Sequence, residues 1–97
     1  MIIKMPKPTK VDRIRFILDY WDPCRMREKA GPMFYNYEAE VLAQGIRKNS
    51  KKESVSKQVK EVIDKKLQLE GCDYTVDEDN AGRVAEAILN SMKASQR

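Results

Sequence analysis

The sequence contains no histidine, the side chain that enzymes most often use to transfer protons near neutral pH. Acid–base or nucleophilic work would then need a carboxylate, lysine or thiol with a strongly shifted pKa. Cys24 is the best placed of these, since Arg25 and Arg27 follow it and nearby positive charge lowers the pKa of a thiol. No general base accompanies Cys24. We therefore expect a protein that is not an enzyme, with no catalytic residue and no cofactor.

The cysteines also bear on metal binding and on the cell compartment. Cys24 and Cys72 are far apart, form no CxxC pair and have no histidine to complete a zinc site. Two isolated cysteines of this kind are typically buried small side chains or free thiols, and they argue against a secreted disulfide scaffold. The beginning of the chain has neither a signal peptide nor a lipidation motif, and no apolar run is long enough to span a bilayer. We expect a cytoplasmic protein that does not contact membranes.

The segment from Asp77 to Gly82 imitates the opening of a calcium-binding loop, with acids at its first and third positions and glycine at its sixth. Ala81 stands at the fifth position, and Ile88 stands at the twelfth, where a bidentate glutamate is required. The acids are better explained as residues of a first helical turn, where the helix dipole favours negative charge. The sequence therefore predicts no metal site.

Apolar residues recur at intervals of three and four along most of the chain, which is the pattern of amphipathic helices. A chain of 97 residues, with 41% hydrophobic and 35% charged residues, suits one small hydrophobic core. Residues 1–8 are expected to be extended or frayed. The sequence predicts an all-α fold, a single compact four-helix domain over residues 1–97, with helices near 10–21, 36–48, 54–69 and 76–93.

Polar residues before the apolar runs are candidate helix caps. Thr9 and Asp12 have the spacing of a capping box. The later helices can be capped by Asn36, by Ser50 with Glu53 or Ser54 alone, and by Thr75 with Glu78. The carboxylates of Asp22 and Glu38 are suited to receive backbone N–H groups or an arginine at helix starts. Proline disfavours the α conformation in the residue before it, and glycine favours a left-handed helix end, so the first helix should end at Asp22-Pro23 and the third at Gly71.

The inward faces follow from the same spacing. Tyr37, Val41 and Ile46 are expected to satisfy the inward face of the second long helix, where Gly45 would allow another helix to approach closely. One core is predicted to contain Val11, Ile14, Leu18, Leu42, Ile46, Val59, Ile63, Val84, Ile88 and Leu89.

Aromatic residues are concentrated in one part of the chain: six of the seven lie between Phe16 and Tyr37. In one interpretation, Trp21, Phe34 and Tyr37 close one end of the bundle, and tyrosine hydroxyls cap backbone groups. In the other, the loop before the second long helix presents anchors of a protein interface, where aromatic side chains, methionine and arginine are enriched. With Tyr37 assigned to the inward face, the residues just before it are free to point elsewhere. The predicted partner-binding residues are Arg25, Arg27, Met33, Phe34 and Tyr35.

A local pattern resembles a known family. The first helix ends in Trp21-Asp22-Pro23, and Pro32 then precedes Tyr35 and Glu38 by three and six residues. This resembles the YugE-like family of small uncharacterised bacterial proteins, and the later helices fit that plan over nearly the full chain. The resemblance implies a compact helical fold and carries over no activity. The basic N-terminal extension and the lysine-rich break at 47–52 depart from the pattern.

The leading functional prediction is a small non-catalytic protein-binding module, inhibitory, immunity-type or regulatory, that acts by protein–protein contact. Charge favours an alternative, because residues 1–52 hold 12 lysines and arginines against 6 acids, a balance of +6. That alternative is an accessory nucleic-acid-binding protein with weak and salt-dependent affinity. Its phosphate contacts would come from Lys4, Lys7, Lys10, Arg13, Arg15, Arg25, Arg27 and Lys29, to which Arg47, Lys48, Lys51 and Lys52 could add.

Overall fold

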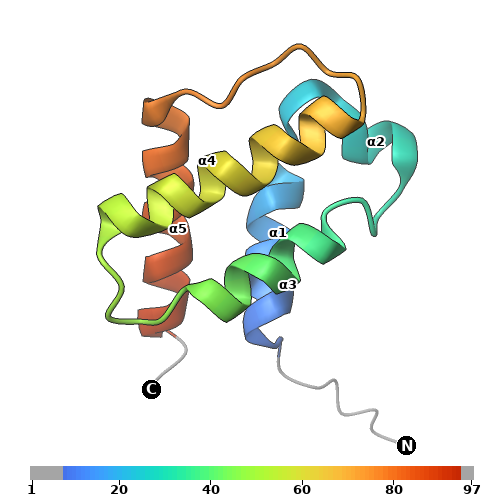
Figure 1. The fold of residues 1–97 in the computed structure, drawn as a ribbon. Helices are drawn as coiled ribbons and strands as arrows, with labels where there is room; N and C mark the ends of the chain where they lie inside the picture. The colour runs from blue at the N-terminus through green and yellow to red at the C-terminus, as the bar shows by residue number, and fades with distance from the viewer. Residues whose placement is uncertain (1–7, 95–97) are drawn as a thin grey trace, which may run out of the picture.

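The long apolar-periodic stretches are α-helices in the computed structural model, which describes residues 8–94. The described residues contain no strand, so the all-α prediction is confirmed. The four-helix prediction is too simple, because the connection after the first helix contains a 3-10 helix and a short α-helix of its own. The elements, drawn in Figure 1, are α1 (Lys10–Trp21), η1 (Pro23–Arg25), α2 (Met26–Ala30), α3 (Asn36–Gly45), α4 (Lys52–Leu69) and α5 (Glu78–Ala94). The expectation for residues 1–7 lies outside the described part.

The four long helices form a closed ring of neighbours. Helix α1 packs against α3 and α5, and α4 packs against the same two helices. Figure 1 shows two layers, with α3 and α4 running across α1 and α5. Each helix therefore buries one face toward a shared centre and leaves the other in solvent.

The core sits at that centre and follows the predicted spacing. Ile14 of α1, Leu42 of α3, Ile63 of α4 and Ile88 of α5 have no exposed surface. The other predicted core positions are buried as well, apart from Val11, which is partly buried against the core. Periodicity alone therefore identified the side chains that hold the four long helices together.

The inward face of α3 differs from the prediction. Tyr35 has 0% of its surface exposed, whereas Tyr37 is 69% exposed. The buried positions are Tyr35, Ala39, Leu42 and Ile46, at intervals of four, three and four, so the inward stripe begins at the residue before the helix. Tyr37 and Val41 lie on the adjoining face. The prediction that Tyr37 points inward and leaves Tyr35 free is wrong.

Three predicted helix ends are confirmed. The backbone N–H of Asp12 donates to Thr9 Oγ1 over 3.1 Å, and the N–H of Thr9 donates to Asp12 Oδ2 over 3.0 Å, which completes a capping box. Asp22 follows α1 in a left-handed conformation, with its N–H donating to the carbonyl of Leu18 over 2.8 Å. Gly71 follows α4 with a φ of 77°, a conformation that glycine adopts without steric cost.

The predicted caps of the later helices are wrong. Helices α3 and α4 begin without a side-chain cap, so Asn36 does not cap α3. The Ser50 hydroxyl accepts a backbone N–H within the loop before α4 instead of one from the helix. At α5 the cap is Asp77 in place of Thr75, because Asp77 Oδ1 accepts the N–H of Asn80 over 2.7 Å.

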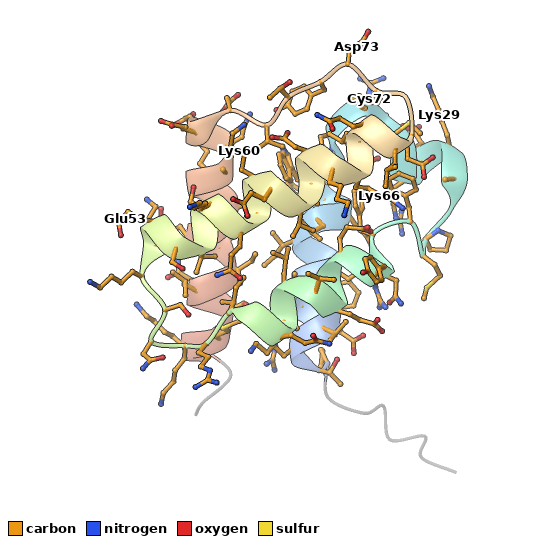
Figure 2. The ribbon with its side chains drawn as sticks, viewed as in Figure 1. Lys29, Glu53, Lys60, Lys66, Cys72 and Asp73 are labelled. Atoms are coloured by element: carbon orange, nitrogen blue, oxygen red, sulfur yellow. A yellow bond between two sulfur atoms is a disulfide. The ribbon has the colours of Figure 1, made fainter. Side chains whose placement is uncertain are left out.

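A disulfide joins Cys24 of η1 to Cys72 in the loop after α4. This corrects the interpretation of the two cysteines as separate buried residues or free thiols. The fold brings their Cα atoms within 6.7 Å although 48 positions separate them in sequence. Figure 2 shows Cys72 where the loop leaves α4. Disulfides persist mainly in oxidising compartments, so the cysteines no longer favour a cytoplasmic location, which stays a prediction.

The loop that carries Cys72, residues 70–77, is fixed at its far end by a clamp from α4. Asp64 Oδ1 accepts the N–H of Val76 over 2.7 Å, and Lys60 Nζ donates to the carbonyl of Val76 over 2.6 Å. Lys60 and Asp64 also pair with each other at 3.0 Å, and the Val76 side chain is fully buried. Lys60 is labelled in Figure 2. The disulfide is therefore anchored to a well-held part of the fold.

Within residues 8–94, no helix combines the length and apolarity needed to cross a bilayer.

Candidate functional site

The segment from residue 22 to residue 34 is organised around one carboxylate. Asp22 Oδ1 accepts the N–H of Arg27 over 2.8 Å, and Oδ2 accepts the N–H of Glu28 over 3.3 Å. These are otherwise unsatisfied donors in the first turn of α2. The Tyr35 hydroxyl donates to Asp22 Oδ1 over 3.1 Å. The prediction that Asp22 receives backbone N–H groups at a helix start is confirmed.

Two of the five predicted partner-binding residues belong to the interior. Tyr35 is fully buried, and burial, together with the charge of Asp22, raises the pKa of its hydroxyl, which stays a neutral donor. Phe34 is half-buried: its ring meets the Tyr35 ring edge-on at 4.8 Å between centroids. Lys66 Nζ lies 4.3 Å from the Phe34 centroid. In this conformation Tyr35 has no surface for a partner to contact, and Phe34 has little.

The other three predicted residues reach the surface. Met33 is 60% exposed, Arg25 is exposed and Arg27 is half-buried. The structure brings Met33 and Arg27 together beside α1, where both line the same hollow. Arg25 does not line that hollow, although it lies on the same segment.

Sequence reasoning missed two large side chains that complete this surface. Phe16 is 53% exposed and Tyr20 is 95% exposed. The spacing could have identified them, because each stands two positions after a core residue, Ile14 or Leu18, on the opposite side of α1. They border a hollow of about 400 Å³. We call this the aromatic surface, and it is lined by Arg15, Phe16, Asp19, Tyr20, Arg27, Pro32 and Met33.

An ion pair lies within the aromatic surface. Arg27 Nε is 3.6 Å from Asp19 Oδ2. Neither Arg27 Nε nor Asp19 Oδ1 has a hydrogen-bond partner, although both atoms are buried. Burial raises the pKa of Asp19, and the positive charges of Arg27 and Arg15 offset this only in part. The pair holds Arg27 in place against α1, but the carboxylate is poorly solvated.

Arg15 is also held in one position. Its Nη2 lies 3.3 Å from Asp12 Oδ1, and its Nη1 donates to Asn36 Oδ1 over 3.3 Å. The guanidinium carbon lies 5.4 Å from the centre of the Phe16 ring. An arginine with this many contacts loses little rotamer freedom when a partner binds. The two arginines of the aromatic surface are thus preorganised.

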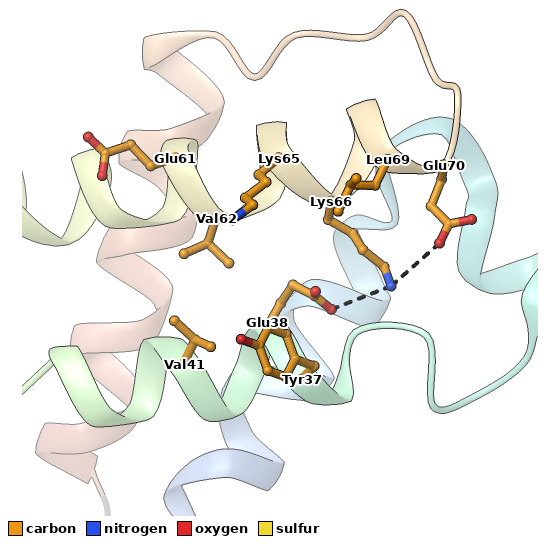
Figure 3. Close-up of a pocket in the computed structure, with 9 residues that line it drawn as sticks. All are labelled: Tyr37, Glu38, Val41, Glu61, Val62, Lys65, Lys66, Leu69 and Glu70. Carbon is orange, nitrogen blue, oxygen red and sulfur yellow. Dashed lines mark ion pairs between the residues drawn. The ribbon is translucent and has the colours of Figure 1, made fainter.

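A second hollow, of about 470 Å³, lies between α3 and α4 and is shown in Figure 3. Val41 and Val62 form an apolar side. At its other end Lys66 Nζ lies 3.9 Å from Glu38 Oε1 and 3.7 Å from Glu70 Oε1. Glu38 therefore pairs with a lysine of α4, which corrects the prediction that it receives a backbone N–H or an arginine at a helix start. The lining of this hollow holds three glutamates, Glu38, Glu61 and Glu70, and two lysines, Lys65 and Lys66.

Metal ligands do not gather in the part of the chain that the structure describes. No group of three or more histidine, cysteine, aspartate or glutamate side chains is placed to hold a metal ion there.

Comparisons of the chain with protein-family models, with curated proteins and with solved structures find no match. The resemblance to the YugE-like family therefore stays a prediction.

Proposed function

We propose that this chain is a small protein-binding module that acts by contact through the aromatic surface. The observation that carries the proposal is the grouping of Phe16, Tyr20 and Met33, three large exposed side chains, around one hollow. Exposed apolar side chains that occur singly are ordinary, but a contiguous group beside arginines is typical of an interface.

The charges around the aromatic surface favour an acidic partner. Arg15 and Arg27 line the hollow with one acid, Asp19; Arg27 pairs with Asp19, and Arg15 pairs with Asp12, which lies outside the lining. Arg25 and Lys29 are exposed on the segment beside it, together with one acid, Glu28. A partner protein that presents carboxylates around one apolar side chain would fill the apolar hollow and pair with the cations around it. Tyr20 and Phe16 would be the central contacts and the arginines the rim.

Nucleic acid is the alternative that the same side chains favour. Exposed aromatic rings can stack on bases, and arginines can bind phosphates. Of the cations proposed for this role, Lys4 and Lys7 lie outside the described residues. A nucleic-acid ligand would be held by charge, so its affinity would fall steeply as salt increases.

Site-specific photo-crosslinking in the native cell tests the proposal. A photoreactive phenylalanine analogue replaces Tyr20 in one chain and Tyr37, also exposed but on α3, in a matched control. We expect one discrete protein adduct from position 20 that resists nuclease and is lost when Phe16→Ser is added. Identical adducts from both positions, or an adduct that nuclease removes, would contradict the proposal, and the second outcome would favour nucleic acid.

A further inference from the structure

The disulfide holds a segment whose backbone is strained. Asp22, Cys24 and Arg25 have φ values of 37°, 64° and 52°, in the left-handed region that residues with a Cβ atom rarely adopt. Such conformations persist only where surrounding contacts impose them. One set of contacts is the hydrogen bonding of Asp22 described above, together with the hydrogen bond from the Tyr35 hydroxyl to the Pro23 carbonyl. The other is the bond from Cys24 to Cys72.

The two ends of that bond are unequally supported. Cys72 lies in the loop 70–77, which the Lys60–Asp64 clamp fixes at Val76. Its backbone N–H donates to the carbonyl of Leu67 over 2.9 Å at the end of α4. Cys24 lies in η1, which leads directly into the five-residue α2; Pro23 of η1 is buried, and Met26 of α2 is partly buried against the core. Breaking the bond would therefore loosen the η1–α2 side, which keeps the hydrogen bonds to Asp22, the Tyr35–Pro23 hydrogen bond and the Arg27–Asp19 ion pair, and would leave the α4 side in place.

The loosened side carries part of the aromatic surface. Arg27 belongs to α2 and reaches Asp19 across the hollow, and Met33 follows α2 through Gly31 and Pro32. Phe16 and Tyr20 belong to the long helix α1 and do not depend on η1. The aromatic surface therefore has one half fixed on α1 and a second half, Arg27 and Met33, on the segment that the disulfide helps to hold in position.

We propose that the Cys24–Cys72 disulfide is a redox switch for the aromatic surface, which is intact when the bond is formed and loosened when a dithiol reduces it. This inference rests on the proposed function of that surface. Both cysteines are partly buried against the core, so neither residue is wholly shielded from solvent. The dithiol's thiolate attacks one sulfur, and its second thiol then completes an intramolecular disulfide in the reductant. Two electrons and two protons pass to Cys24 and Cys72, which become thiols.

Backbone NMR of the full chain without any partner tests the loosening. In the oxidised chain, the N–H of Arg27 is bonded to Asp22, and the N–H of Gly31 is bonded to the carbonyl of Arg27. After reduction we expect both amides to shift and to show lower heteronuclear NOE values, while amides in the middle of α4 keep theirs. The double variant Cys24→Ser, Cys72→Ser should reproduce the reduced spectrum without reductant.

Two results would contradict the proposal that the disulfide is a local redox switch. Unchanged shifts and NOE values at Arg27 and Gly31 would show that the disulfide does not control the segment. Loss of the α4 signals on reduction would show that the bond supports the whole fold and is no local switch.

The partner captured through Tyr20 allows a separate test of whether the redox state of the disulfide changes binding at the aromatic surface. We expect the reduced chain to bind it about tenfold more weakly, within the usual range of coupling between two sites. Equal affinity in both redox states would refute the coupling. If Tyr20→Ala leaves binding unchanged, the proposed function fails, but the NMR result still decides whether the disulfide controls the segment.

Discussion

The Tyr35 hydroxyl donates a hydrogen bond to Asp22 Oδ1 over 3.1 Å and also reaches the carbonyl oxygen of Pro23 over 3.3 Å. This contact joins the beginning of α3 to the end of α1. Because Asp22 also accepts the N–H of Arg27, one carboxylate fixes three elements. It therefore sets the path of the segment that delivers Met33 to the aromatic surface.

Removal of that hydroxyl should destabilise the fold. We expect Tyr35→Phe to lower the free energy of unfolding by about 1.5–3 kcal/mol, since the buried donor bonds a charged group. Tyr37→Phe is the matched control, because Tyr37 is mostly exposed, and it should change stability by less than about 0.5 kcal/mol. Urea unfolding of both variants measures the difference. Equal stability of the two variants would show that the Asp22–Tyr35 contact contributes nothing.

The burial of Asp19 should make stability depend on pH. Its folded-state pKa is raised above the ordinary value of 3.8, so the folded protein holds this proton more tightly than the unfolded chain does. The contribution of Asp19 to stability is therefore fully present below the unfolded pKa and is lost as pH rises through the folded pKa. We expect Asp19→Asn to raise the melting temperature at neutral pH and to have little effect near about pH 3.

The control for this prediction is Asp73→Asn, which removes a charge from an exposed loop position. Thermal melts at several pH values compare the two variants with the parent. A lower melting temperature for Asp19→Asn at neutral pH would mean that the ion pair with Arg27 outweighs the burial of the carboxylate.

The core prediction is tested on α5. Ile88 has no exposed surface, so Ile88→Ala should cost about 2–5 kcal/mol of unfolding free energy. Leu69→Ala removes a side chain that is 76% exposed and should cost less than about 0.5 kcal/mol. A change at Ile88 as small as that at Leu69 would place the wrong face of α5 in the core.

The helices and the core could be predicted because they depend on local chemistry. Ile14 and Leu18 in α1, or Val59 and Ile63 in α4, are spaced so that only one helical face can bury them all. The Thr9–Asp12 cap is equally local, since both partners lie within one turn. Burial of these faces against each other leaves little choice of fold class.

The positions of Tyr35 and Tyr37 could not be predicted in the same way. Three aromatic residues, Phe34, Tyr35 and Tyr37, fall where the helix begins, and a shift of two positions exchanges the buried ring for the exposed one. What decides between them is the carboxylate of Asp22, which satisfies the Tyr35 hydroxyl from an earlier helix. The proximity of Asp22 to Tyr35 depends on how α1 and α3 pack, so it cannot be predicted from local spacing.

The disulfide and the aromatic surface also depend on contacts between distant parts of the chain. Spacing does not reveal that Cys24 and Cys72 meet, because the pairing depends on where the loop after α4 returns. Met33 and Arg27 of the surface were predicted from composition, whereas Phe16 and Tyr20 were not, although the helical spacing of α1 placed both away from the core.

The proposed function is tested most directly by the affinity of the purified chain for the partner captured through Tyr20. Calorimetric titration compares Tyr20→Ala with Tyr37→Ala, since both remove an exposed tyrosine ring but only the first lies on the aromatic surface. We predict that Tyr20→Ala weakens binding by at least about 2 kcal/mol, or about 30-fold, while Tyr37→Ala leaves it unchanged. Equal affinity of both variants and the parent chain would contradict the assignment of the aromatic surface as the binding site.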